Sequence, residues 1–436
     1  MKQEYEGPTR RHVLAVGTAA AAVAPISGGL AKARPDIVRQ DLERYVSFGI
    51  KASGGAGDNA SGAWLEAELA HQGFKVHRQT FAVPYFSASR AELVLDRHAA
   101  PVIPQGIVVQ TGRTGVEGRL VRVDPMLPIT QSLSGAIALI DLPYSRWVSA
   151  LQKPIHDGVR AAIARGARAA VIITNGPTQK AIALNTDGNK PMFSVPVGVL
   201  APEQAQPFLL GAMRGATASF YLTGEGGRRD AYNFVGHLDR GRPKWIIVST
   251  PRSGWFTCAA ERGPGVAIWL ALARWAPTAF HGYNLAFMCN SAHEYEYLGA
   301  DQAIREIAPK PENTAVWLTL GASIAARDWQ TLIPPLLPLP SADPQRYLVV
   351  SPNVHTLAKR AFSGQPGIDN PYTTERFTAG ELTPIHKAGY KTVAGFFGAH
   401  RFMHTQEDDE RCIVVQPTHS AIKGCQAFLR SVIAKT

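Results

Sequence analysis

The chain has 436 residues, of which 45% are hydrophobic and 18% charged, and its formal net charge is +11. This composition excludes an intrinsically disordered chain, and the length favours two domains over one. The Lys and Arg residues are scattered without a basic run, which argues against a nucleic-acid-binding protein.

Residues 1–33 are predicted to be a twin-arginine signal peptide. Arg10 and Arg11 precede an Ala-rich apolar run, and Ala31-Lys32-Ala33 offers a small-residue cleavage site. The run is too short and too weakly apolar to span a bilayer, and no other stretch is predicted to be a stable membrane span. We therefore expect a periplasmic or extracellular protein. The alternative is a disordered N-terminal tail.

The next elements are predicted in the order helix, Gly-rich loop, helix and strand. A helical pattern begins at residue 36, and the Gly-rich loop covers residues 53–62. A second helix is expected over residues 63–72, because Gly73 provides a typical helix end. A strand follows near residues 76–81.

From residue 93 to residue 227 the pattern becomes rich in short strands. Strands are predicted at residues 106–110, 118–123, 136–140, 166–173 and 193–199, with a helix at 153–165.

From residue 228 to the C-terminus, strands alternate with helices, which predicts a mainly parallel sheet covered on both faces. The strands are expected at residues 232–236, 245–249, 285–290, 316–320 and 392–397, and the helices at 266–275, 298–307, 354–363 and 418–435. The Pro-rich stretch 333–340 is expected to be a packed connector, or else a pocket wall or subunit contact.

The most informative residues are His293 and Glu294, which directly follow the apolar run 284–290. A potential base and a potential metal ligand thus stand at a sheet edge, where open α/β sheets carry their chemistry. The segment Ser291–Ala300 resembles the strand-to-loop segment of the M28 zinc aminopeptidase family, in which two consecutive glutamates stand.

The resemblance covers residues 36–430. It implies an α/β, zinc-exopeptidase-like three-layer fold with a mainly parallel mixed sheet. The M28-like domain would comprise residues 34–92 and 228–436. The β-rich stretch 93–227 resembles the protease-associated (PA) domain that is often inserted in M28 enzymes. It would either shape substrate access or serve only as a structural module.

The family holds two zinc ions with five ligands in the order His, Asp, Glu, Asp, His. The matching positions here are Thr250, Glu261, Glu294, Thr319 and His404. Thr250 and Thr319 are lost-ligand positions, and Arg252 replaces the Asp that would brace the first His. The resemblance therefore implies one zinc ion on Glu261, Glu294 and His404, with an open coordination position. Glutaminyl cyclases, relatives on the same fold, use a single zinc.

His293 occupies the family's general-base position, and an imidazole with an ordinary pKa of about 6.5 suits that role. It could equally fill the vacated space or bind the metal. A metal-independent alternative uses Ser253 or Cys258 as nucleophile with His293 as base, although no G-x-S-x-G motif surrounds Ser253. None of the four cysteines forms a C-x-x-C pair, so a cysteine zinc site is not expected.

The side chains predicted to bind substrate are Arg252, Arg262, Trp255 and Trp317. Each has a plainer interpretation. The two arginines could instead form salt bridges with Glu261, and the two tryptophans, like Phe256 and Trp329, could belong to the core. Asp58 lies in a segment that looks like the family's bridging-Asp motif, but before the insertion, so we expect it to cap a helix.

The sequence predicts an exported M28-like hydrolase or acyl-transfer enzyme acting on an amide, a peptide or a related small molecule. The alternatives are a non-catalytic peptide- or protein-binding relative and a metal-independent hydrolase.

Overall fold

The computed structural model describes residues 36–332 and 335–435. The predicted signal peptide lies outside these residues, so export stays a prediction. Within the described ranges, no helix combines the length and apolar character that a membrane span requires.

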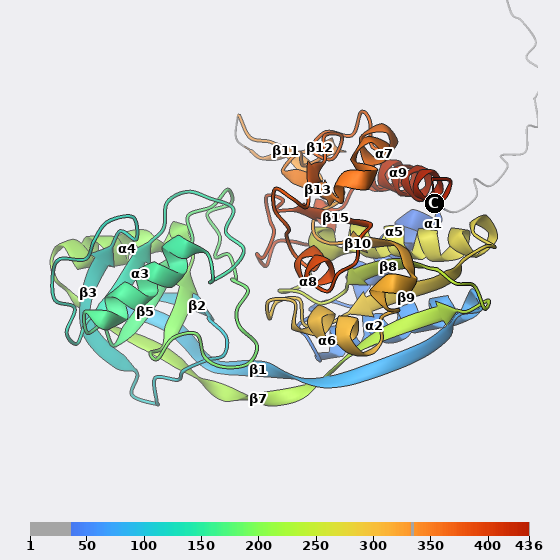
Figure 1. The fold of residues 1–436 in the computed structure, drawn as a ribbon. Helices are drawn as coiled ribbons and strands as arrows, with labels where there is room; N and C mark the ends of the chain where they lie inside the picture. The colour runs from blue at the N-terminus through green and yellow to red at the C-terminus, as the bar shows by residue number, and fades with distance from the viewer. Residues whose placement is uncertain (1–35, 333–334, 436) are drawn as a thin grey trace, which may run out of the picture. The chain divides into compact units, whose positions relative to one another are not determined.

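A mixed sheet with a parallel centre organises the C-terminal part (Figure 1). Its neighbouring strands β9 (Asn284–Asn290), β8 (Trp245–Pro251), β10 (Thr314–Leu320) and β15 (Val393–Gly398) are all parallel. Antiparallel strands β7 (Thr217–Leu238) and β13 (Arg346–Val350) border this centre, and the two-residue β14 (Tyr372–Thr373) ends the sheet. The predicted alternation of strands and helices is confirmed here.

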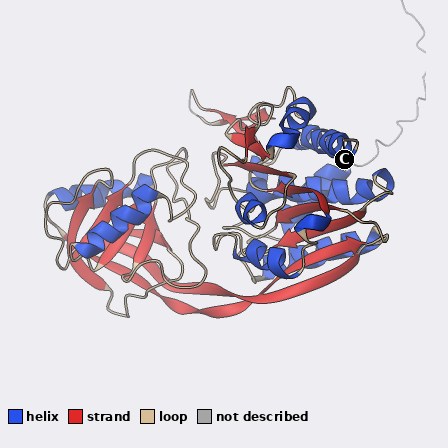
Figure 2. Cartoon of the chain, in the orientation of Figure 1, coloured by secondary structure: helices blue, strands red, loops and turns tan. Residues whose placement is uncertain are grey.

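Helices cover both faces of this sheet (Figure 2). One face packs on α1 (Ile37–Ser47), α2 (Ala56–His71), α5 (Ala259–Ala279), α7 (His355–Ala361) and α9 (Val415–Ile433). The other face packs on α6 (Leu298–Glu306) and α8 (Leu382–Lys387). In β8, Ile246 and Val248 enter the first core and Ile247 the second, because successive side chains point to opposite faces. The predicted three-layer α/β fold is confirmed.

Two long strands connect this sheet to the segment predicted as an insertion. Strand β1 (Lys75–Leu95) pairs with β7 from Lys75↔His237 to Val94↔Ser219, with one irregularity at Ala88/Arg90 (Figure 1). Their outer halves join β2 (His98–Pro104), β3 (Val116–Val123), β4 (Ile137–Asp141), β5 (Ala169–Ile173) and β6 (Val197–Leu200). Helices α3 (Lys153–Ala164) and α4 (Pro202–Met213) accompany them. These strands bury two cores of their own, and their assignment to the PA class stays a prediction.

Three local predictions were wrong. Helix α2 begins at Ala56 rather than near residue 63, because its glycines allow close packing: a Cβ on Gly62 would lie 2.4 Å from the Tyr232 hydroxyl oxygen. Residues 106–110 form no strand, and Ile107 and Val108 line a cavity instead. Within the Pro-rich stretch, residues 337–340 belong to β12 (Leu337–Ala342), which pairs with β11 (Arg327–Gln330) and leaves Leu337 51% exposed.

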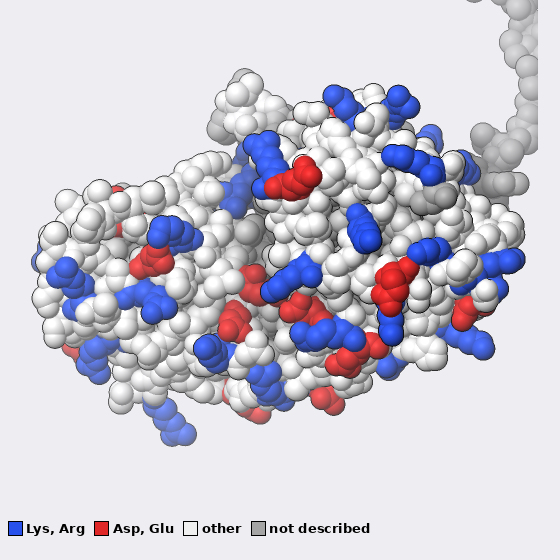
Figure 3. All heavy atoms as spheres, in the orientation of Figure 1, with Lys and Arg blue, Asp and Glu red and all other residues white. Residues whose placement is uncertain are grey.

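The basic residues do not gather into one surface patch on the face shown in Figure 3. Lys and Arg side chains lie there among Asp and Glu side chains. This mixture agrees with the scattered charges of the sequence.

Candidate functional site at the carboxyl edge of the sheet

The site lies where the four parallel strands end. The loops that follow β8, β9, β10 and β15 comprise residues 252–258, 291–297, 321–326 and 399–404. Seven of the nine non-glycine residues with positive φ in the described chain lie in these loops: Phe256, Cys258, Ala292, Glu296, Tyr297, Ser323 and His404. Such backbone conformations are unfavourable for L-residues and cluster at functional sites. The predicted position of the site therefore coincides with the loops that hold most of the strained backbone among the described residues.

Glu294 is buried, and both of its carboxylate oxygens accept hydrogen bonds. Its Oε1 accepts bonds from the backbone N–H and the hydroxyl of Ser53, both at 2.7 Å, and its Oε2 accepts one from the Ser253 hydroxyl at 2.9 Å. The Ser253 hydroxyl oxygen also accepts a bond from the His293 backbone N–H at 3.3 Å. Glu294 thus joins the two loops and the N-terminal segment, and both carboxylate oxygens are occupied.

Glu261 forms a buried ion pair with its sequence neighbour Arg262. The Glu261 Oε1 lies 2.6 Å from Arg262 Nη2 and 3.1 Å from His404 Nε2, and all three side chains are fully buried. Burial raises the pKa of Glu261, but the charges of Arg262 and His404 outweigh this effect and hold that pKa well below its usual range. The salt bridge predicted between Glu261 and Arg262 is confirmed, whereas Arg252 has another partner.

His404 is held in place by the segment predicted as an insertion. Its Nδ1 donates to the Ala183 carbonyl oxygen at 2.9 Å, and the Ala183 N–H donates to the His404 carbonyl oxygen. The Thr186 N–H donates to the Glu294 carbonyl oxygen. We call residues 183–186, all buried, the covering segment. It lies directly on the candidate site.

The predicted zinc ligands do not fit a metal ion in this arrangement. Glu261, Glu294 and His404 bring no three ligand atoms together, and Arg262 places a cation on the carboxylate that would bind the metal. A carbonyl partner on Nδ1 does orient a histidine as zinc ligands are oriented, so His404 alone retains that feature. Among the described residues, the one group close enough for a metal is His400, Asp408 and Cys412.

The proximity of His400, Asp408 and Cys412 has a structural explanation. The Asp408 carboxylate accepts bonds from the backbone N–H groups of Ala260 and Glu261, in the first turn of α5. The His400 Nδ1 accepts a bond from the Phe402 N–H. Asp408 thus already caps the first turn of α5, as expected at a helix N-terminus, and the His400 Nδ1 is bonded within its own loop.

His293 pairs with a residue that the sequence analysis did not identify. Its Nδ1 lies 2.5 Å from Glu381 Oε1, and its ring packs against Tyr297. Burial raises the pKa of Glu381, but the charge and hydrogen bond of His293, together with Arg262, bring it below its usual value. Glu381 is 88 residues from His293 and directly precedes the short helix α8, so no local motif marks it.

The His293–Glu381 pair opens on a cavity of about 420 Å³, which we call the His293 cavity. Its aromatic walls are Tyr297, Tyr347 and Phe397. The segment predicted as an insertion contributes residues 146, 148–149 and 185. The Glu381 Oε2 is buried and has no hydrogen-bond partner among the described residues. Glu381 lines the cavity, but this oxygen is enclosed, so a ligand N–H group would reach it only after the side chain turns toward the cavity.

The predicted nucleophiles are not arranged for catalysis. The Ser253 hydroxyl donates to Glu294 rather than to the His293 ring. The Cys258 thiol is buried 3.3 Å from the Tyr45 hydroxyl, and burial raises the pKa of the thiol to about 12. A protonated, enclosed thiol is a poor nucleophile.

The predicted substrate-binding roles of Arg252 and Trp317 need correction. Arg252 is fully buried, and its Nε lies 3.0 Å from Asp58 Oδ1. Asp58, in the first turn of α2, therefore serves as counter-ion rather than as helix cap. Trp317 is 1% exposed and packs in the core against Tyr390. Trp255 does line a cavity, where its Nε1 donates to the Asn185 side-chain oxygen.

The lost-ligand positions are occupied by buried hydroxyl groups. Thr250 donates to the Leu320 carbonyl oxygen at 3.0 Å. The Thr319 hydroxyl has no partner among the described residues. A zinc ion bound at these two positions would need the imidazole and the carboxylate that the family has there. Both side chains are neutral hydroxyls in this protein.

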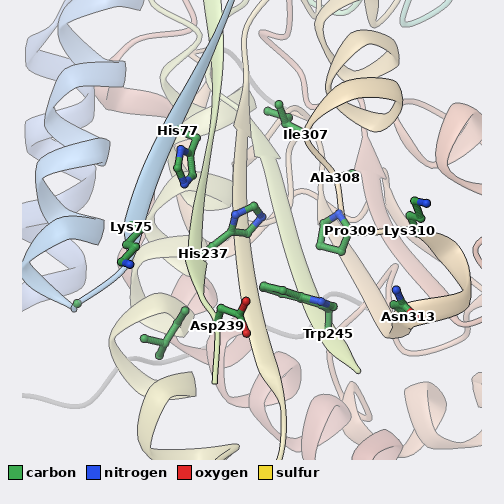
Figure 4. Close-up of a pocket in the computed structure, with 12 residues that line it drawn as sticks. Lys75, His77, His237, Asp239, Trp245, Ile307, Ala308, Pro309, Lys310 and Asn313 are labelled. Carbon is green, nitrogen blue, oxygen red and sulfur yellow. The ribbon is translucent and has the colours of Figure 1, made fainter. Parts of the chain in front are cut away.

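A larger cavity of about 520 Å³ lies at the opposite end of the sheet (Figure 4). It is lined by Trp245, the first residue of β8, and by His77 and His237, whose ring centroids are 5.8 Å apart. Burial, together with His77, lowers the pKa of His237. The candidate site lies in the loops that follow the last residues of the parallel strands, whereas this cavity lies near the first residue of β8. The two are therefore separate.

Comparison with known proteins identifies the fold. A scan against protein-family models finds no match. A search of curated proteins also finds none. Solved structures do match: the chain has the fold of the M28 zinc aminopeptidases.

Three of these structures illustrate the likeness. The zinc aminopeptidase BSAP from Bacillus subtilis superposes with a TM-score of 0.70 at 17% identity, over 90% of this chain and 94% of that chain. A peptidase M28 precursor from Shewanella amazonensis gives 0.68 at 17% identity, over 91% and 96%. An aminopeptidase from Aneurinibacillus sp. gives 0.64 at 17% identity, over 90% and 93%. At this identity the likeness establishes the fold alone.

Proposed function

We propose that this protein, after export, binds peptides or related amides in the His293 cavity without a metal centre. It would then be a non-catalytic relative of the zinc aminopeptidases. The observation that carries the proposal is the buried Arg262 guanidinium, 2.6 Å from the Glu261 carboxylate. A guanidinium is permanently charged, so it already compensates the carboxylate and opposes a dication at the same place.

The His293 cavity supports a peptide ligand by its chemistry. Once the Glu381 side chain turns toward the cavity, its unpaired Oε2 can accept a peptide N–H or ammonium group, and the aromatic walls can pack on an apolar side chain. The matching structures from Bacillus subtilis and Shewanella amazonensis are an aminopeptidase and a peptidase precursor, which agrees with a ligand of this class.

The first test combines metal analysis with peptide binding by the mature protein. We expect no stoichiometric zinc after purification, and binding of short peptides by calorimetry that EDTA leaves unchanged. Glu381→Gln should weaken peptide binding by about tenfold or more, because it removes a charge-assisted hydrogen bond. Glu375→Gln is the control, because it removes one negative charge from an exposed residue. This variant should bind peptides as the parent protein does.

Stoichiometric zinc with EDTA-sensitive peptide hydrolysis would replace this proposal with the one-zinc hydrolase on Glu261, Glu294 and His404. Absence of peptide binding in the presence and absence of zinc would reject the proposal altogether.

A second function is favoured by the 2.5 Å contact between His293 and Glu381. A carboxylate that orients an imidazole beside a cavity is the arrangement of a general base, which could act on a bound amide or ester without metal. In that case hydrolysis would persist in EDTA and fall by about 100-fold or more in His293→Ala. The rate in EDTA, measured on peptide and ester substrates, separates this function from simple binding.

A further inference from the structure

A second cavity, of about 360 Å³, shares no lining residue with the His293 cavity. We call it the Arg229 cavity. Five half-buried rings line it: Tyr85, Phe86, Trp255, Phe256 and Tyr295. Ile103, Ile107 and Val108 add aliphatic surface. Such a volume and such walls are typical of a small-molecule site.

Among the described residues that line this cavity, Arg229 is the one with a charge. Its Nε donates to the Ser53 carbonyl oxygen at 2.7 Å, which fixes the plane of the guanidinium. Glycine at position 55 makes room for this side chain, because a Cβ there would lie 3.3 Å from Arg229 Nη2. The two terminal nitrogens have no hydrogen-bond partner within the described part of the chain. A positioned guanidinium with free N–H groups therefore faces an otherwise apolar cavity.

The tryptophan of the wall is also fixed. Trp255 donates from Nε1 to the Asn185 side-chain oxygen at 2.9 Å, and the Tyr295 hydroxyl donates to the Pro84 carbonyl oxygen at 2.8 Å. With their polar atoms already bonded, these two rings offer their apolar faces to a ligand.

We propose that the Arg229 cavity binds a small carboxylic acid with an aromatic or branched apolar body. The carboxylate would pair with the free N–H groups of Arg229, which match its two oxygens, and the body would pack among the rings. An uncharged ligand would leave the guanidinium without a counter-ion, and none of the described lining residues is acidic to supply one. This site is independent of the His293 cavity and of the function proposed for it.

The test is calorimetric binding of N-acetyl-L-phenylalanine and of its amide to the mature protein. The two ligands have the same shape and differ in charge. We expect the acid to bind about tenfold or more tightly than the amide, because one charge-assisted contact is lost in the amide. Arg229→Gln should remove most of this difference.

Arg228→Gln is the matched control. Arg228 is the preceding residue of β7, and its guanidinium donates to the carbonyl oxygens of Gly188 and Asn189 outside this cavity. It removes the same charge and should keep the preference for the acid. The proposal is overturned if the unmodified protein binds acid and amide equally, if it binds neither at millimolar concentration, or if folded Arg229→Gln retains the preference. The comparison of the two ligands on the unmodified protein decides the matter even if the Arg229 variant fails to fold.

Discussion

Replacing Arg262 with methionine is expected to lower the free energy of unfolding by about 3–5 kcal/mol, the usual result of leaving one partner of a buried ion pair uncompensated. Methionine is shorter than arginine but of similar volume, so the change removes mainly the charge and the Nε hydrogen bond to the Ser253 carbonyl oxygen. Glu261 would keep the His404 contact but lose its nearest cation. The measurement is urea unfolding at neutral pH.

Two controls separate the ion pair from general damage. Arg411→Met breaks an exposed pair with Asp409 and should lower stability by at most about 1 kcal/mol. The double variant Glu261→Gln with Arg262→Met should lose less stability than the sum of the two single variants, because the pair is removed as a whole. Equal effects of the buried and exposed arginines would contradict a buried counter-ion at this site.

The pH dependence of stability provides an independent readout of the same pair. The folded pKa of Glu261 lies well below its ordinary value of 4.5, so its stabilising contribution is present above about pH 4.5 and is lost as the pH falls below it. With Arg262→Met the folded pKa should rise towards that of the unfolded chain. The acid-induced loss of stability should therefore be shallower in the variant than in the parent protein.

The strands of the site were predictable because their sequences are continuous apolar runs. In β8 and β9 almost every side chain is buried, on one face or the other, and a buried parallel strand has this composition. The same runs placed His293 and Glu294 at a strand end. Helix α2 was predicted too short because Gly57 and Gly62 are typical of loops, whereas here they permit close packing.

The hydrogen-bond and ion-pair partners of the site residues were less predictable, because a sequence motif gives the residue type at each position and not the contacts between distant positions. Arg262 stands next to Glu261 in the sequence, so their ion pair was foreseeable. Glu381 comes from 88 residues beyond His293, and Ser53 from 241 residues before Glu294, with no spacing that connects them. Glu261, Glu294 and His404 have side chains of the types that bind zinc, so the sequence predicted a metal site. In the structure their hydrogen bonds join them to different partners.

Replacing Gly299 with alanine is expected to destabilise the protein by about 3 kcal/mol and to displace the loop that carries His293 and Glu294. A Cβ at this position would lie 2.0 Å from the Ser291 carbonyl oxygen and 2.9 Å from the Asn233 side-chain oxygen. Both are fixed, since the Asn233 amide donates to the Gly299 carbonyl oxygen and its oxygen accepts from the Ser291 N–H. Overpacking of this kind usually costs about 1–3 kcal/mol, and the contact with backbone places it at the upper end.

Helix propensity alone predicts the opposite sign, because alanine is favoured over glycine in a helix by up to about 1 kcal/mol, and Gly299 lies in the first turn of α6. Gly282→Ala is the control, since nothing lies within 4 Å of the added Cβ there, and it should be neutral or slightly stabilising. Thermal unfolding of both variants decides between packing and propensity. A Gly299→Ala protein as stable as Gly282→Ala would mean that the Ser291 loop can move aside, and then the backbone constraint we assign to the His293–Glu294 segment would not exist.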